Sequence, residues 1–336
     1  MATAGLARRT RTAGIALAGS TALVLTACGG VDTATGGDDG GDWPSGTVQM
    51  YVGADPGGSS DLISRAVSKG LAEELDSSFP VINKPGSNGA LAAAEVASAE
   101  PDGSTIAIQN ASLFAITPLA VSEDEVTSIE DFDVVYGVSR DDYVMVTNPD
   151  SGYASVEDLE GATGKVTYGT TGVGTGSQLS CALLFGNLGT NAEAVPFDGG
   201  APALTALLGA QVDTACLQVG EAIENIEAGK LVPLSVFGPE RVEYLPDVPT
   251  AAEQGLDVEV AQYRFMTVPK GTPDDVVDTL VEGMQATFET EEYQQFNEQN
   301  SLTPMEIPGD EVVAQLEEDK QRYADLVEQY GISLAE

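Results

Sequence analysis

Three glycine-rich segments are the residues of this sequence best suited to binding chemistry. Each follows a predicted strand and precedes a predicted helix, and they cover residues 55–61, 172–177 and 198–200. Such a turn leaves several backbone N–H groups pointing at one spot, with the positive end of the helix dipole behind them. The pattern therefore favours an anion site. For any one of these turns taken alone, a plain connection between a strand and a helix is the alternative.

The first of these segments has the most complete pattern. Alternating apolar residues predict a strand over residues 47–52, and the chain then turns at Pro56-Gly57-Gly58. Apolar residues at a spacing of 3.6 predict the helix that follows, at Leu62, Ile63, Ala66, Val67 and Leu71. We expect a side-chain oxygen of Ser59, Ser60 or Asp61 to cap this helix.

The elements that must position these turns alternate between strand and helix along most of the chain. This order predicts a parallel sheet with helices on its faces, where ligands bind outside the carboxyl ends of the strands. The end of the next strand, at Gln109 and Asn110, shares that edge. We predict two α/β domains with a ligand cleft between them, joined by two crossing segments. The first domain covers residues 47–146 and 263–336, and the second covers residues 147–262.

The absence of histidine limits the catalytic chemistry of this chain. Without it, Ser-His-Asp and Cys-His catalysis and most zinc sites are excluded, and we expect neither a cofactor nor a metal. Besides Cys28, the cysteines of the sequence are Cys181 and Cys216. Cys181 lies in a predicted helix and Cys216 in a predicted strand. This placement is compatible with a disulfide or with two buried free thiols.

The first 27 residues read as a signal peptide of the lipoprotein type. Three arginines precede an apolar run over residues 14–25 that is too short to span a membrane in the mature protein, and small residues then lead to Cys28. We expect Cys28 to be the lipidated N-terminus that holds the protein at the outer face of the cell membrane. Residues 28–46, rich in Gly, Asp and Thr, predict a flexible tether. The leader is compatible with export by the general secretory route or by the twin-arginine route.

The charge of the mature chain is strongly negative. Without the three leader arginines it has 11 basic and 53 acidic residues, a formal charge of −42. Such a charge excludes nucleic acids and anionic membrane surfaces as partners.

Six motifs in order make the chain resemble a substrate-binding receptor of the tripartite tricarboxylate transporter family, the TctC or Bug type. The resemblance covers residues 47–336. The motifs are Asp55-Pro56-Gly57-Gly58-Ser59-Ser60-Asp61 with Arg65, Asn83-Lys84-Pro85-Gly86-Ser87-Asn88-Gly89, Ala99-Glu100-Pro101-Asp102-Gly103, Gly172-Val173-Gly174-Thr175-Gly176-Ser177, Val195-Pro196-Phe197-Asp198-Gly199-Gly200-Ala201-Pro202-Ala203-Leu204 and Leu245-Pro246-Asp247-Val248-Pro249-Thr250.

The resemblance implies a periplasmic-binding-protein type II fold and a receptor rather than an enzyme. It also implies that a small di- or tricarboxylate-like acid binds to backbone amides and is delivered to a two-subunit membrane permease. We expect the receptor to be a monomer. The predicted ligand-binding residues are residues 55–61, Gln109, Asn110, Gly174, Thr175, Gly176, Ser177 and Asp198.

Three positions depart from the family pattern, and other functions stay open beside this one. Asp55 and Asp198 place acids where the family usually has an apolar and a basic or polar residue, and Gln178 stands where a histidine is common. Because a pair of carboxylates can act as acid and base, a hydrolase that uses Asp55 and Asp198 is one alternative. A receptor that serves a sensor kinase instead of a permease is the other.

Overall fold

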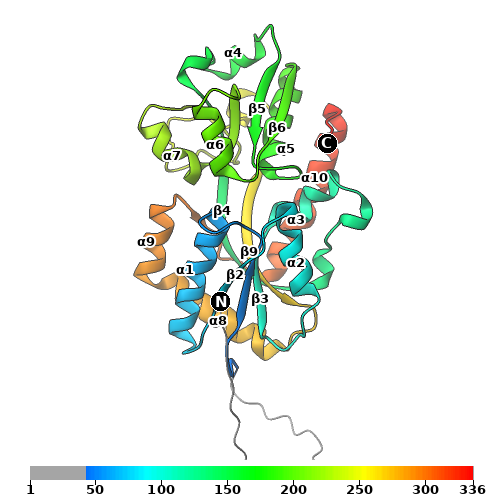
Figure 1. The fold of residues 1–336 in the computed structure, drawn as a ribbon, viewed down its shortest axis with the longest axis vertical. Helices are drawn as coiled ribbons and strands as arrows, with labels where there is room; N and C mark the ends of the chain where they lie inside the picture. Colours follow the sequence, from blue (N-terminus) through cyan, green and yellow to red (C-terminus); the bar gives the residue numbers. More distant parts are fainter. Residues whose placement is uncertain (1–42, 336) are drawn as a thin grey trace, which may run out of the picture. The chain divides into compact units, whose positions relative to one another are not determined.

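Ten strands make up one mixed sheet in the computed structural model, which describes residues 43–335 (Figure 1). The predicted leader, Cys28 and most of the predicted tether lie outside the described residues. The strands are β1 Gln49–Val52, β2 Val81–Asn83, β3 Thr105–Asn110, β4 Phe132–Thr147, β5 Val166–Thr170, β6 Ala192–Pro196, β7 Thr214–Gln218, β8 Val232–Val236, β9 Ala261–Pro269 and β10 Thr303–Pro304.

The strands form two parallel groups on either side of two antiparallel strands. The order is β2-β1-β3-β9-β4-β7-β5-β6, with β8 and β10 also paired to β4. The pairs β1–β2, β1–β3, β5–β6 and β5–β7 are parallel, as the strand–helix alternation predicts. Strands β4 and β9 run antiparallel to each other and to their neighbours β3 and β7. We call β1, β2 and β3 the first group and β5, β6 and β7 the second group.

Strand β4 is longer than the sequence suggested. We expected two strands, over residues 132–139 and 143–147, because the polar residues between them resembled a loop. The structure has one continuous strand that pairs with β9 up to Asp142 and with β7 and β8 from Tyr143 onward. Arg140 and Asp142 form an ion pair at 3.2 Å, which satisfies their charges within the strand. The change of partners therefore falls between Asp142 and Tyr143.

Helices cover both faces of the first group. The buried side chains of α1 and α8 pack with Ile106 and Ile108 of β3, whereas those of α2, α3 and α10 pack on the opposite face, where Ala107 points. The helices are α1 Ser59–Glu74, α2 Ala90–Ala97, α3 Ala111–Ala115, α4 Val156–Glu160, α5 Gly176–Leu188, α6 Gly200–Leu208, α7 Val219–Glu227, α8 Asp274–Glu289, α9 Glu291–Gln299 and α10 Gly309–Tyr330.

Two further features concern the chain ends and the cysteines. Trp43, which we placed in the tether, is half-buried and packs edge-on against Phe79 at a ring distance of 6.5 Å, so that side-chain packing already begins at Trp43. Cys181 of α5 and Cys216 of β7 form a disulfide with their Cα atoms 5.9 Å apart.

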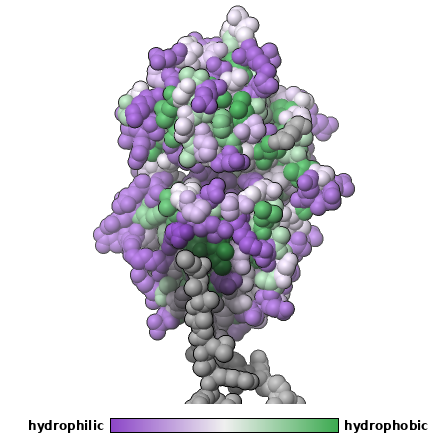
Figure 2. All heavy atoms as spheres, in the orientation of Figure 1, coloured by the Kyte–Doolittle hydropathy of each residue, from purple (hydrophilic) through white to green (hydrophobic). Residues whose placement is uncertain are grey.

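The described residues, 43–335, group together as a single unit. The predicted division into two domains thus stays a prediction. Within the described residues, no helix combines the length and the apolar character needed to span a membrane. Hydrophilic residues cover much of the face shown in Figure 2, with smaller apolar areas between them.

Candidate functional site

A cavity of about 790 Å³ lies where the helix starts of both strand groups meet β4 and β9. Its wall includes residues at the beginning of α1, α6 and α7, and the loop that leads into α5. Each of these helices follows a strand directly, so the carboxyl ends of parallel strands bring the helix starts to the cavity.

The start of α1 offers fewer free amides than the sequence suggested. The N–H of Gly57 donates to Asp61 Oδ2 at 2.8 Å, and the N–H of Gly58 donates to the Asp55 carbonyl at 3.1 Å. Ser59 and Ser60 are the first two residues of the helix, where an N–H has no carbonyl acceptor within the helix. Both residues line the cavity, so their N–H groups are the ones that can reach a ligand.

Asp61 was predicted as a ligand-binding residue, but it does not line the cavity. It is 1% exposed and accepts hydrogen bonds from Gly57, from Asn83 Nδ2 at 2.8 Å and from Arg65 Nε at 3.0 Å. No side chain caps α1 at its N-cap residue Gly58, in contrast to our expectation. Asp61 instead holds the preceding turn in shape.

The second glycine-rich segment is also only partly at the cavity. Thr171, Gly172, Val173 and Thr175 line it. The predicted residues Gly174, Gly176 and Ser177 do not line it, because the chain uses them internally. The N–H of Gly174 donates to Gln178 Oε1 at 2.8 Å. The Ser177 hydroxyl donates to the Cys216 carbonyl, and a built Cβ on Gly176 would lie 2.5 Å from the Tyr143 ring.

The third segment contributes the start of α6, whose residues Gly200 and Ala201 were not among the predicted ligand-binding residues. Gly200 and Ala201 are its first two residues, and both line the cavity. No side chain caps this helix at Gly199. Asp198, and Asp55 of the first segment, also line the cavity, and both are exposed. The structure therefore places the two predicted aspartates at the exposed edge of the cavity.

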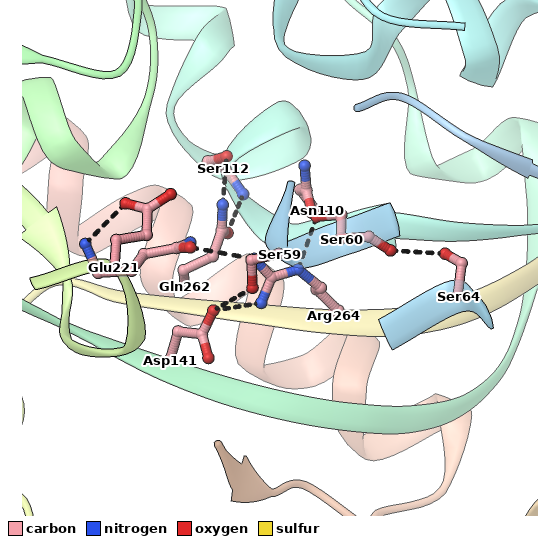
Figure 3. A network of polar contacts seen from close by, with 10 residues as sticks. Ser59, Ser60, Ser64, Asn110, Ser112, Asp141, Glu221, Gln262 and Arg264 are labelled. Carbon is pink, nitrogen blue, oxygen red and sulfur yellow. Dashed lines mark hydrogen bonds and ion pairs between the residues drawn. The ribbon is translucent and has the colours of Figure 1, made fainter. Parts of the chain in front are cut away.

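A buried arginine lies at the centre of the polar side chains in Figure 3. Arg264 of β9 is 2% exposed, and its Nε donates to Ser60 Oγ at 2.7 Å. Its Nη1 forms an ion pair with Asp141 Oδ2 at 2.5 Å. Ser59 Oγ donates to the same Asp141 oxygen at 3.3 Å. With its amide oriented to satisfy both neighbours, Gln218 accepts from Arg264 Nη2 at 3.1 Å and donates to Asp141 Oδ2 at 3.3 Å.

Glu221, the third residue of α7, adds a fourth acid to the wall of the cavity. It accepts a hydrogen bond from the N–H of Gln218 at 3.3 Å. Burial raises the pKa of the Glu221 carboxyl to about 7; the Gln218 bond opposes this rise, and the charge of Asp141 adds to it. The carboxylate lies against α6, since a built Cβ on Gly200 would be 2.0 Å from Glu221 Oε1.

Sequence reasoning found nine of the fourteen predicted residues at the cavity and missed its charged centre. The nine are Asp55, Pro56, Gly57, Gly58, Ser59, Ser60, Asn110, Thr175 and Asp198. Gln109 instead donates to Thr267 Oγ1 at 2.7 Å, away from this cavity. Asp141 and Arg264 were missed because each lies in a strand, the first in a run read as a loop. A lone arginine within the apolar run of β9 was the available signal.

Comparison with known proteins shows which proteins this chain is similar to. The model of the family described as "Tripartite tricarboxylate transporter family receptor" matches residues 63–332. A curated Agrobacterium vitis protein, a UPF0065 protein from an intergenic region, is 33% identical over 254 residues, covering 73% of this chain and 72% of its own.

Two solved structures are also similar. MatC from Rhodopseudomonas palustris, solved with bound malate, is 27% identical, with a TM-score of 0.74 over 85% of this chain and 100% of its own. An R. palustris protein solved with adipate is 25% identical, with a TM-score of 0.81 over 87% of this chain and 99% of its own. The predicted periplasmic-binding-protein fold is thereby confirmed.

Proposed function

Because this chain belongs to the tripartite tricarboxylate transporter receptor family, whose members are extracytoplasmic solute-binding proteins, we propose that it binds a small organic acid in the cavity. The observation that carries this proposal is the meeting of two uncapped helix starts at the cavity wall. The first two N–H groups of α1 and of α6, at Ser59, Ser60, Gly200 and Ala201, have no acceptor within their helices. A carboxylate satisfies such groups and interacts favourably with both helix dipoles.

The hydrogen bonds of such a site supply an energy of the same order as micromolar binding requires. Each hydrogen bond to a charged group contributes about 1.5–3 kcal/mol, so four amides supply roughly 6–12 kcal/mol before the costs of association. Micromolar affinity requires about 8 kcal/mol net. The malate and adipate found in the two R. palustris structures support an acid as the ligand class. We expect binding without turnover, since Ser59 and Ser177 have no histidine to activate them.

A titration panel tests the acid ligand directly. We expect at least one mono-, di- or tricarboxylic acid to raise the melting temperature of the purified full chain and to bind in calorimetry. The corresponding methyl esters and amides, which have the same carbon skeletons without the charge, serve as controls and should have no effect. If no acid binds, or if the esters bind as well as the acids, the proposal is wrong.

The setting of the receptor at the membrane is the second part of the proposal. We propose that Cys28 is lipidated and that the anchored receptor passes its ligand to a two-subunit permease. Cys28→Ser should leave the leader uncleaved at this site and should abolish labelling by a clickable fatty acid. Cys181 and Cys216 form a disulfide, so they provide no alternative site for the label. Unchanged labelling of the variant would refute the anchor.

A further inference from the structure

The charges on the cavity wall indicate a narrower class of ligand than organic acids in general. Among the described residues, four acids line the cavity and Arg264 is the single basic residue there. The acids are Asp55, Asp141, Asp198 and Glu221. Asp141 already compensates the charge of Arg264, because both side chains are more than nine-tenths buried and their oxygen and nitrogen atoms are 2.5 Å apart. A ligand with two or three carboxylates would therefore enter a site whose uncompensated charge is negative.

The positions of donors and acceptors are as informative as their number. Asp141 lies within one hydrogen bond of Ser59, the first residue of α1. A carboxylate bound to the Ser59 and Ser60 amides would consequently lie next to a protein carboxylate. The contact is unfavourable unless the ligand carries a positive group beside its own carboxylate, because like charges at such distances repel.

Asp141 also has an oxygen suited to such a group. Its bonds to Arg264, Ser59 and Gln218 all end on Oδ2, and within the described residues no hydrogen bond reaches Oδ1. Glu221 likewise receives its one hydrogen bond, from Gln218, on Oε2, and none from the described residues on Oε1. An ammonium, with three N–H donors and no acceptor, is the group that matches free carboxylate oxygens.

From these contacts we propose that the ligand is an α-amino acid or a close analogue, with its carboxylate on the amides of α1 and its ammonium on Asp141 and Glu221. The proposal rests on the function proposed above and narrows its substrate class from organic acids to zwitterions.

The first test compares acids that differ in one group, by calorimetry on the purified full chain. Malate and aspartate differ in a hydroxyl against an ammonium, and adipate and 2-aminoadipate differ in the presence of the ammonium. We expect aspartate and 2-aminoadipate to bind about tenfold or more tightly than their partners, as is typical of one added hydrogen-bonded charge. Asparagine, which lacks the second carboxylate, should bind more tightly than aspartate.

The second test uses the protonation of Glu221. The charged groups around its carboxyl are Asp141 on β4 and Arg264 on β9, with Tyr143 of β4 and the start of α6 also facing it. Since the pKa of Glu221 is about 7, raising the pH from 6 to 8 ionises it, while the ammonium of asparagine stays protonated. Asparagine affinity should therefore rise severalfold over this range. Glu221→Gln should remove the rise, and Glu224→Gln, an exposed acid of the same helix, should retain it.

The two levels of the proposal fail in different ways. If malate and adipate bind as tightly as their amino counterparts, or if Glu221→Gln and Asp141→Asn weaken diacids as much as amino acids, the zwitterion inference is overturned and the acid receptor stands. If no acid of either kind binds, the proposed function itself is wrong. A preference for the amino compounds that both variants reduce would support the inference.

Discussion

Asp61 shows how a residue with the right type and spacing for a ligand can serve the fold instead. It follows the glycine turn and lies in the first turn of α1, which is why we predicted it to bind the ligand. In the structure it accepts bonds from the turn, from Asn83 and from Arg65. Burial alone would raise the pKa of Asp61, but these three partners outweigh it, and the pKa lies below the usual value.

This role predicts a loss of stability rather than of affinity. Asp61→Asn keeps the size of the side chain but removes its charge, so we expect the free energy of unfolding to fall by about 2–3 kcal/mol at pH 7. Because the pKa of Asp61 is depressed in the folded protein, its stabilising effect is present above pH 4 and is lost as the pH falls further. Urea titrations at pH 7 and pH 3 should show the gap between wild type and variant closing.

Asp55 serves as a matched control, because it tests whether the loss of stability is specific to the buried acid Asp61. Asp55 precedes the same turn but is exposed, and within the described residues its side chain makes no hydrogen bond. Asp55→Asn should change the free energy of unfolding by less than about 0.5 kcal/mol. Equal losses for the two variants would contradict the structural role given to Asp61.

At the scale of elements, sequence patterns predicted the strand–turn–helix units and the edge of the sheet where they meet. Apolar periodicity and glycine turns are local signals, and they were enough to place the starts of α1 and α6 close to the cavity. They could not reveal which N–H groups the turns use themselves, because the acceptors Asp61 and Gln178 act through folded geometry. Nor could they reveal that the polar run before Tyr143 continues a strand.

The start of α1 allows one amide to be removed without breaking the helix. Proline is well tolerated at the first helical position, and the extended conformation of Gly58 (φ −72°, ψ 162°) suits the residue before a proline. Ser59→Pro should therefore fold normally but weaken acid binding about tenfold or more, by calorimetry. Ser59→Ala, which loses only the hydroxyl bond to Asp141, isolates the effect of the amide. Should both variants bind equally, the Ser59 amide is not part of the site.

At the scale of the whole molecule, composition and motif order determined more than any single residue did. The absence of histidine and the excess of acid excluded classes of function, and the six motifs together predicted the family that the comparison confirmed. The charge of the cavity could not be predicted from composition or motif order. It depends on which five of the many charged residues line the cavity, and two of these, Asp141 and Arg264, come from strands far apart in the sequence.

The cavity wall draws on both strand groups, and this predicts a change of shape when ligand binds. Ser59 follows β1 of the first group and Gly200 follows β6 of the second group, so one ligand that bonds to both must hold the groups together. β4 and β9 are the strands that cross between the groups, and β4 changes partners between Asp142 and Tyr143. Small-angle scattering should give a smaller radius of gyration with a saturating acid than without it.

The same motion should respond to a contact between Gly174 and Thr117, neither of which lines the cavity. The Gly174 carbonyl, in the loop before α5, accepts from Thr117 Oγ1 at 3.1 Å and from Asn88 Nδ2 at 3.3 Å, both in segments that precede β4. These bonds favour a closed arrangement. Thr117→Val keeps the shape of the side chain but removes its donor, so we expect a larger radius in the unliganded variant and weaker binding of the same acid. If scattering is identical with and without ligand in both proteins, the two groups do not move, and the acid must reach its site through a rigid opening.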